Sequence, residues 1–353
     1  MNILYITYID FGNFTSGSMV RPQKIYDALL KSKNEIKLVY GNQNDKEFRK
    51  QQVKEIRKWL MNTKPDFCYI ETPSYPFLNN FDISLIKKIH KMKVPILIFY
   101  RDAYWKFPEI WGKKGLKKLI LLLFYKRDVR IIKKNCDIIY FPSNGMVNLF
   151  NFKNSKVLMP VCDINISEKK QIYKQVIYVG GISDRYGTKL LLDAFEIINK
   201  YSINIKLNLV CRKIEWDKFS EDMGKKEWLN VYHCSGGEDL KKIYNKSDIA
   251  VIPFKKVKYM DIAVPVKLFE YLGYGMPIVA TNCAETEKII LDFKCGLICN
   301  DNAQSIADTI EKLYSNVDEI EAIKDNIKNI VDNNTWGKRV ETIINDANNV
   351  KRI

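Results

Sequence analysis

The chain is poor in the residues that usually build metal and redox sites. Only two of its 353 residues are histidine, His90 and His233, and no Asp-x-Asp motif occurs in it. Its eight cysteines are scattered, and none of them forms a CxxC pair. Thiols with this distribution are typical of a reducing compartment, where they stay free and mostly buried. We therefore expect no zinc site, no disulfide and no resident metal ion.

Long apolar runs are absent as well. No run reaches the ~20 apolar residues that a membrane-spanning helix needs. The composition, 46% hydrophobic and 28% charged, is that of an ordinary globular protein. The first residues, Met1–Thr7, lack the basic segment and cleavage site of a signal peptide and read as a strand. We therefore expect a cytoplasmic protein.

Positive charge is in excess. The formal net charge is +16 at pH 7. Lysine, asparagine and isoleucine are all abundant, as is typical of an AT-rich genome, which weakens any inference from total charge. The basic residues are widely spread and form no aromatic–basic RNA-binding motif, so we expect no nucleic-acid partner. Nucleoside diphosphates and an acidic membrane surface are compatible with this charge.

Short apolar runs alternate with amphipathic stretches along the chain. The strands predicted in the first half are Ile3–Ile9, Glu35–Tyr40, Asp66–Glu71, Pro95–Tyr100, Asp137–Phe141 and Lys156–Met159. Those predicted in the second half are Val176–Val179, Ile205–Val210, Asn230–His233, Asp248–Pro253, Pro277–Ala280 and Gly296–Cys299. This alternation predicts an α/β fold with parallel sheets that helices cover on both faces.

The two sets of strands predict two doubly wound domains. A polar segment, 160–171, separates them, and the chain is long enough to give each domain a core. We expect an N-terminal domain over 1–162 and a second domain over 163–336. Ligands of such folds bind at the carboxyl ends of strands, so the cleft between two facing domains is the expected site.

The segment Pro265–Thr281 reads as a helix, a glycine-containing turn and a buried strand. Proline can open a helix, because its missing N–H is one of the groups left unbonded there. Lys267 and Glu270, three residues apart, share a helix face close to that opening. The N–H groups of a helix start beside a lysine suit a diphosphate, and the glutamate suits the vicinal hydroxyls of a ribose. The segment predicts a nucleotide-sugar site.

This segment resembles the donor-site signature of retaining glycosyltransferases with the GT-B fold, specifically glycosyltransferase family 4. The resemblance runs from about Gln175 to Trp336 and implies that Lys267 meets the donor diphosphate and that Glu270 binds the ribose. It also implies that the last helix, 337–353, packs back on the first domain, whereas from the sequence alone this helix could equally end the second domain. The missing Asp-x-Asp motif counts against the metal-dependent single-domain glycosyltransferases.

On the donor side, this sequence differs from the family's pattern at several positions. The family's glutamate that contacts the donor sugar is Ile262 here, with Asp261 as a candidate substitute. An arginine and a lysine of the family are replaced by Gly181 and Tyr186, and Arg185 either stands in for them or is a solvated loop residue. Gly180, together with Gly181, ends a strand and would let the backbone approach a ligand closely.

Two further loops are donor-side candidates. Arg212 directly follows a buried strand, which places it at the ligand edge; it either binds phosphate or forms a surface ion pair. With Lys267 it would offset a diphosphate without a metal. Ser235 lies in a strand-to-helix turn that the resemblance places near the nucleotide base, although a plain capped turn is an equal reading.

The acceptor side is expected in the first half. Ser16, Gly17 and Ser18 follow the first strand and resemble the family's glycine loop, with Arg21 as an added charge. Arg101 and Asp102 end the fourth strand, where the aspartate would orient or deprotonate an acceptor hydroxyl. An ion pair between them, or a helix cap, is the alternative.

A basic stretch with apolar and aromatic residues spans 104–134. It contains Lys113, Lys114, Lys117, Lys118, Lys126, Arg127, Arg130, Lys133 and Lys134 around the apolar run Leu119–Tyr125. Such a helix suits an anionic membrane surface, so peripheral attachment to the inner face of the plasma membrane is expected. The alternative is a core helix, whose apolar face would also use the leucines.

Taken together, the motifs and the family resemblance imply an enzyme of the hexosyltransferase type, with retention implied by the resemblance. The expected reaction moves a sugar from a nucleoside-diphosphate sugar, with a UDP-sugar as the expected donor, to a saccharide hydroxyl with retention and without a metal or other cofactor. Lys267, Arg212 and Asp102 are the candidate catalytic residues. A lipid-linked acceptor in bacterial surface polysaccharide synthesis is expected. A silent subunit of a partner enzyme and a nucleotide-sugar epimerase are the alternatives.

Overall fold

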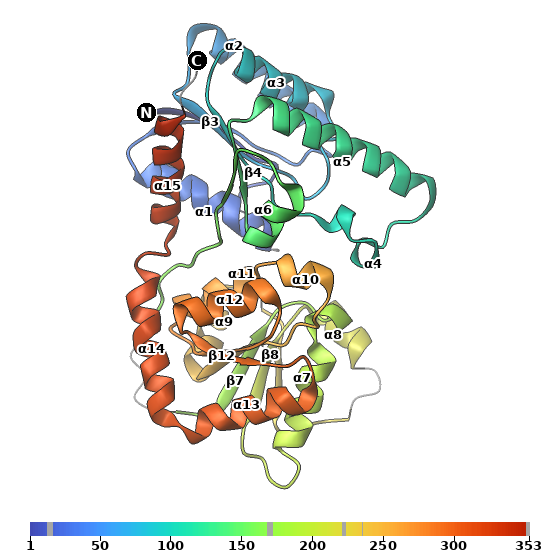
Figure 1. The fold of residues 1–353 in the computed structure, drawn as a ribbon, viewed down its shortest axis with the longest axis vertical. Coiled ribbons are helices and arrows are strands. Elements are labelled where there is room, and N and C mark those ends of the chain that lie inside the picture. The colour runs from blue at the N-terminus through green and yellow to red at the C-terminus, as the bar shows by residue number, and fades with distance from the viewer. Residues whose placement is uncertain (13–16, 168–171, 221–223, 235, 351–353) are drawn as a thin grey trace. The chain divides into compact units, whose positions relative to one another are not determined.

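The computed structural model describes residues 1–12, 17–167, 172–220, 224–234 and 236–350. The chain divides into two compact units, Met1–Met159 with Trp336–Ile353, and Pro160–Thr335 (Figure 1). Among the described residues, no helix combines the length and the hydropathy that crossing a membrane requires.

The first unit is built on a parallel six-stranded sheet in the order β2-β1-β3-β4-β5-β6. Its strands are β1 Asn2–Ile6, β2 Glu35–Val39, β3 Phe67–Glu71, β4 Ile96–Phe99, β5 Ile138–Phe141 and β6 Ser155–Val157. Its helices are α1 Gly17–Lys31, α2 Lys46–Asn62, α3 Asn80–Lys91, α4 Pro108–Trp111, α5 Gly115–Asn135, α6 Asn144–Phe150 and α15 Trp336–Asn349, with a 3-10 turn at Tyr104–Lys106. The central strands β3, β4 and β5 are buried along their whole length, as expected of parallel strands covered on both faces.

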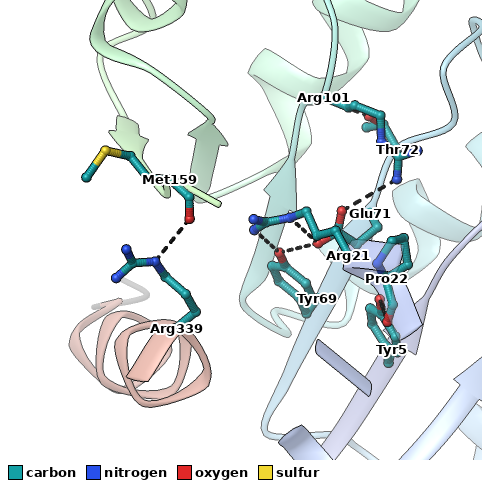
Figure 2. Close-up of polar contacts among 9 residues, drawn as sticks. All are labelled: Tyr5, Arg21, Pro22, Tyr69, Glu71, Thr72, Arg101, Met159 and Arg339. Carbon is teal, nitrogen blue, oxygen red and sulfur yellow. Dashed lines mark hydrogen bonds and ion pairs between the residues drawn. The ribbon is translucent and has the colours of Figure 1, made fainter. Parts of the chain in front are cut away.

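The C-terminal helix α15 belongs to this first unit. It packs beside α1, and Tyr140 donates a hydrogen bond to Asp346 at 2.6 Å. Arg339 Nε donates to the carbonyl oxygen of Met159 at 3.0 Å (Figure 2). These contacts hold a segment from the end of the chain on a sheet built from its first half.

The second unit has a parallel six-stranded sheet in the order β12-β11-β10-β7-β8-β9. Its strands are β7 Gln175–Val179, β8 Lys206–Val210, β9 Leu229–Tyr232, β10 Ile249–Ile252, β11 Ile278–Thr281 and β12 Gly296–Cys299. Its helices are α7 Thr188–Ile198, α8 Lys213–Phe219, α9 Gly237–Lys246, α10 Lys258–Ile262, α11 Val266–Gly273, α12 Ala284–Phe293, α13 Ala303–Ser315 and α14 Val317–Val331, with a 3-10 turn at Asp184–Tyr186. Residues 160–167 are part of this unit, since Cys162 N donates to Asn334 O and Asn165 N donates to Gly273 O.

One predicted boundary of the first unit is wrong. The sequence predicted that Ser16, Gly17 and Ser18 form a loop between the first strand and the following helix. Helix α1 instead begins at Gly17 and contains Pro22. The hydroxyl of Tyr5 donates to the Pro22 carbonyl at 2.8 Å, which ties this part of the helix to the first strand.

Candidate functional site

The carboxyl edge of the second sheet carries the predicted donor residues. The chain runs outward from β7 to β9 and then returns to β10 on the other side of β7, so the direction reverses between β7 and β10. Ligands of doubly wound sheets bind at such a switch point. Gly180 directly follows β7, and α11 follows β10. The topology therefore brings two segments that the sequence predicted for the donor to the switch point.

Helix α11 starts as the sequence predicted. Pro265 is its N-cap, and among the described residues no side chain hydrogen bonds to this helix start. The first N–H groups of a helix have no partner within the helix and carry part of its positive dipole end. An anion is therefore stabilised at this end of α11.

The ammonium group of Lys267 is buried among aromatic rings. Its Nζ lies 4.0 Å from the ring centroid of Tyr178, 5.2 Å from that of Phe254 and 5.7 Å from that of Tyr186. Within the described part of the chain this Nζ has no hydrogen-bond partner. A Cβ at Gly180 would collide with it, so the amine lies directly against the glycine backbone.

Burial changes the titration of this lysine. Desolvation lowers the pKa of Lys267 to about 7, and the nearby charge of Glu270 opposes that shift. A buried cation without a hydrogen-bonded partner is unfavourable by several kcal/mol. The arrangement suits an anionic ligand, which would supply both the charge and the hydrogen bonds that the ammonium lacks.

Glu270 lies one turn further along α11. Burial raises the pKa of Glu270 above its ordinary value, and the hydroxyl of Tyr244 and the charge of Lys267 both counteract this. The ring of Tyr244 stacks on that of Tyr274 with centroids 4.0 Å apart. A carboxylate held in such surroundings is suited to accept hydrogen bonds from two adjacent hydroxyl groups.

The glycine turn after β7 is fixed by two side chains. The hydroxyl of Tyr178 donates to the carbonyl of Gly181 at 2.7 Å, and Glu215 accepts from the N–H of Ile182 at 2.8 Å. Glu215 also pairs with Arg212 at 3.1 Å, and the Arg212 side chain is 64% exposed. The structure thus shows the surface ion pair that was the alternative for Arg212, and phosphate binding by Arg212 stays a prediction.

The remaining donor candidates have local partners. Arg185 Nη2 donates to the hydroxyl of Tyr186 at 3.1 Å, and the guanidinium lies over that ring. Asp261 accepts from the N–H of Ala284 at 3.0 Å and so caps the start of α12. Ser235 lies outside the described residues.

The acceptor candidates lie in the first unit at the ends of β3 and β4. The N–H of Arg101 donates to Thr72 Oγ1 at 3.3 Å, which joins the two strand ends. A hollow beside them is lined by Thr72, Pro73, Ser74, Tyr75, Pro76, Phe77, Tyr100, Asp102, Tyr125, Asp128 and Ile132. Asp102 therefore faces a concave surface rich in tyrosine. Ser16 lies outside the described residues, and Gly17 and Ser18 are the first residues of α1.

The sequence analysis missed two groups of residues. One is the set of aromatic rings around Lys267. In the sequence, Tyr178 of this set looks like an ordinary core residue of a strand. The other is Glu71, which ends β3 and is fully buried against Arg21 at 3.0 Å. Glu71 had a detectable signal, because a charged residue at the end of an apolar strand is the same pattern that singled out Arg212 and Arg101.

The described residues offer no cluster of metal-ligating side chains. In the described ranges no three histidine, cysteine, aspartate or glutamate side chains are grouped so that they could hold a metal ion. The metal-independent reaction stays a prediction, because a substrate diphosphate can bring its own cation.

Part of the chain is similar in sequence to known proteins. Residues 173–316 match the family model described as glycosyl transferases group 1. A Klebsiella pneumoniae protein described as an uncharacterized 41.2 kDa protein in cps region is 25% identical over 144 residues, 39% of this chain and 36% of that protein. A Bacillus subtilis (strain 168) protein, provisionally named the teichuronic acid biosynthesis glycosyltransferase TuaH, is 32% identical over 90 residues, 25% of this chain and 22% of that protein. The chain thus covers only about a third or less of these relatives.

Solved structures resemble the whole chain. A sucrose-phosphate synthase from Thermosynechococcus elongatus superposes with a TM-score of 0.72 at 11% identity, covering 98% of each chain. Anabaena Alr3699/HepE, solved in complex with UDP, superposes with a TM-score of 0.69 at 12% identity, covering 99% of this chain and 100% of the other. At this identity the likeness shows the fold. The chain therefore has the two-domain Rossmann-like fold of GT-B type that its sequence predicted, and its residues 173–316 match glycosyl transferases group 1.

Proposed function

We propose that this protein transfers a sugar from a nucleoside-diphosphate sugar to a saccharide hydroxyl. The observation that carries the proposal is the buried, unpartnered ammonium of Lys267 at the start of α11, inside the segment that matches glycosyl transferases group 1. The group 1 match and the named relative support a transferase enzyme. The UDP complex of the Anabaena structure supports a UDP-sugar donor.

The proposed chemistry breaks the bond between the sugar C1 and the diphosphate oxygen and forms one from C1 to the acceptor oxygen. Negative charge develops on the departing diphosphate. Lys267, the α11 N–H groups and Arg212 would stabilise that charge, an effect that such preorganised donors commonly exert. Glu270 would hold the ribose, and Asp102 would orient or deprotonate the acceptor hydroxyl. Retention of the anomeric configuration, metal independence and membership of glycosyltransferase family 4 are part of this proposal.

The proposed acceptor belongs to bacterial surface polysaccharide synthesis. The name of the Bacillus subtilis relative, which mentions teichuronic acid biosynthesis, supports this class. An acceptor attached to lipid would require the enzyme to work at a membrane surface. Helix α5 has a face that is suited to bind such a surface.

Helix α5 exposes an apolar stripe among lysines. Its exposed apolar residues are Leu116, Leu119, Ile120 and Leu123, with exposed fractions of 73%, 56%, 44% and 58%. The side of α5 that packs on the unit uses other residues: Leu121, Tyr125, Asp128, Ile132 and Asn135. Packing of α5 against the core of its unit therefore does not explain these exposed apolar residues. We propose that α5 lies on an anionic membrane surface on the cytoplasmic side.

Vesicle binding tests this surface. Replacing Leu119 and Leu123 with serine is expected to weaken binding to phosphatidylglycerol vesicles by at least about tenfold, because each leucine contributes roughly 1.5–3 kcal/mol when buried. Cosedimentation measures the effect. The matched control is Leu291→Ser on α12, because Leu291 is a 57% exposed leucine outside α5. Equal binding by all three proteins would refute the α5 surface.

Two alternatives predict different behaviour. A silent subunit of a partner enzyme would account for the replacement of the family's sugar-binding glutamate by Ile262, but it would not release sugar from a donor. An epimerase needs acid–base groups at its site, and this chain has only two histidines. The imidazole of His233 already has a hydrogen-bond partner within the protein, because its Nδ1 lies 3.1 Å from the Cys211 carbonyl oxygen.

A thermal-shift screen against UDP, GDP, ADP, CMP and their sugar conjugates tests the proposal. A nucleotide at about a hundred times its dissociation constant adds roughly 2.7 kcal/mol of stability, which moves a melting curve visibly. We expect one diphosphate to shift the melting temperature and the matching donor sugar to be hydrolysed slowly. A shift without hydrolysis would favour the silent subunit, and no shift with any nucleotide would reject the donor site.

A further inference from the structure

Helix α5 holds the loop after β3 through a charged pair. We call residues 73–77 the β3 loop. Asp128 Oδ2 accepts from the N–H of Phe77 at 2.6 Å, and Arg127 Nη2 donates to the carbonyl oxygen of Phe77. Arg127 Nη2 also lies 2.8 Å from Asp128 Oδ1. The backbone of Phe77 is therefore bound on both sides by side chains of α5.

The carboxylate of Asp128 depends on these contacts, because its side chain is only 4% exposed. Burial raises the pKa of the Asp128 carboxyl to about 6, and the N–H of Phe77 and the charge of Arg127 oppose that shift. The carboxyl is therefore still mostly ionised at neutral pH. A buried carboxylate that loses its hydrogen bonds is strongly destabilised. This turn of α5 and the β3 loop thus stay joined while the helix is intact.

Tyr125 connects the same part of α5 to two segments of the acceptor side. Its hydroxyl donates to the carbonyl oxygen of Ser74 in the β3 loop at 3.2 Å. Its ring stacks on that of Trp105, which follows Asp102 closely in the chain, with centroids 5.2 Å apart. The β3 loop and Asp102 line the same hollow, whose volume of about 10 Å³ leaves room for no more than about one water molecule. A shift of the β3 loop therefore changes the surroundings of Asp102 directly.

The first turns of α5 lack support from the rest of the unit. The first buried residue of the helix is Leu121, and every residue from Gly115 to Ile120 except Lys118 is exposed. Among the described residues no side chain caps the start of α5. In Figure 1 this end of the helix extends beyond the strands of its unit. Helical turns without caps or packing are only marginally stable in water.

Lipid contact would stabilise these same turns. The exposed apolar residues of α5 begin at Leu116 in the unsupported turns and end at Leu123, directly before the turn that holds the β3 loop. A surface that binds the ordered helix stabilises it by mass action. Because helix formation is cooperative, order in the first turns also stabilises the next turn.

We propose that α5 couples membrane contact to the acceptor side of the protein. An anionic membrane bound to the exposed apolar residues orders α5, and Tyr125, Arg127 and Asp128 are positioning residues through which the helix orders the β3 loop beside Asp102. The inference rests on the α5 surface of the proposed function and adds what that surface does to the acceptor side.

Amide exchange in the β3 loop tests the coupling without turnover. Mass spectrometry of peptides that cover residues 74–78 follows the amide of Phe77 in the full chain, with and without saturating phosphatidylglycerol vesicles. We expect the vesicles to slow this exchange by about tenfold, the usual contribution of one hydrogen bond to a charged group. The double variant Leu119→Ser with Leu123→Ser is expected to show no slowing. Cosedimentation of the same samples measures vesicle binding.

Variants of α5 separate coupling from lipid binding. Asp128→Asn is expected to bind vesicles like the wild type but to lose the slowing, because a neutral amide does not pair with Arg127 and binds the N–H of Phe77 more weakly. If Asp128→Asn fails to fold, Tyr125→Phe decides, because it keeps the ring and removes only the hydrogen bond to Ser74. We expect Tyr125→Phe to reduce the slowing.

The matched control is Asp346→Asn on α15. Asp346 is a carboxylate of the same unit that accepts from the hydroxyl of Tyr140 and pairs with Lys156, outside α5. We expect this variant to bind vesicles and to show the same slowing as the wild type.

The contradicting results are distinct from those for the α5 surface. The inference is overturned if the wild type binds the vesicles while exchange of the Phe77 amide stays unchanged. It is also overturned if the deciding variant of α5 responds like the wild type, or if Asp346→Asn loses the response equally. A wild type that does not bind the vesicles rejects the α5 surface itself, and the inference with it.

Discussion

Lys267→Met is expected to lower kcat/KM for donor turnover by about 10²–10³, the usual cost of removing one preorganised donor from a developing oxyanion. The ammonium group of Lys267 lies at the start of α11 against the backbone of Gly180. No other described side chain places a buried cation at this helix start. Methionine keeps the length and most of the packing of the lysine stem and removes only the charge and the hydrogen bonds.

Release of nucleoside diphosphate from the donor sugar measures this effect. The matched control is Lys288→Met, because Lys288 is an exposed lysine on α12 paired with Asp292, and its loss leaves α11 unchanged. We expect the control to turn over like the wild type. Unchanged turnover in Lys267→Met would show that the diphosphate is held elsewhere.

The same variant is expected to stabilise the protein at low pH. Burial lowers the pKa of Lys267 to about 7, while in the unfolded chain it is near 10.4. The unfolded state therefore binds more protons between these values, so the contribution of this group to stability rises with pH across that window. Below pH 7 both states are charged, and the folded state bears the full cost of the buried ammonium.

Unfolding by urea across pH measures the expected difference. At about 1.4 kcal/mol per pKa unit, Lys267→Met gains up to roughly 4 kcal/mol over the wild type near pH 6, and the gain vanishes near pH 10.4. Glu270, which faces Lys267 on the same helix, reduces the gain, because in the variant its carboxylate loses a cation. A difference that does not change with pH would mean that the ammonium is solvated in the folded protein.

The strands were the most predictable part of the fold. Each predicted strand exists, and the prediction for Gly296–Cys299 matches β12 residue for residue. Strands buried on both faces read as continuous apolar runs, which the sequence shows directly. The ends of the strands were less predictable. The apolar run from Ile3 to Ile9 predicted one strand, but β1 ends at Ile6. Apolar composition continues past a strand wherever the following loop is also buried.

The candidate site was predictable where its residues are neighbours in sequence. Lys267 and Glu270 belong to one helical turn, so their spacing defines a shared face. The rings of Tyr178 and Phe254 come from other strand ends, and their contact with Lys267 follows only from the folded sheet. The same applies to Arg21 and Glu71, which come from different elements. A single sequence carries no direct signal for such contacts.

The most direct test is a calorimetric titration of UDP into the full chain at pH 8 in two buffers of different ionisation enthalpy. A diphosphate that meets Lys267 raises the pKa of this amine from about 7, so binding takes up close to one proton, roughly 0.9 at this pH. Lys267→Met should bind more weakly and take up none. Binding without proton uptake, or with equal affinity and uptake in the variant, would contradict the assignment of Lys267 to the donor diphosphate.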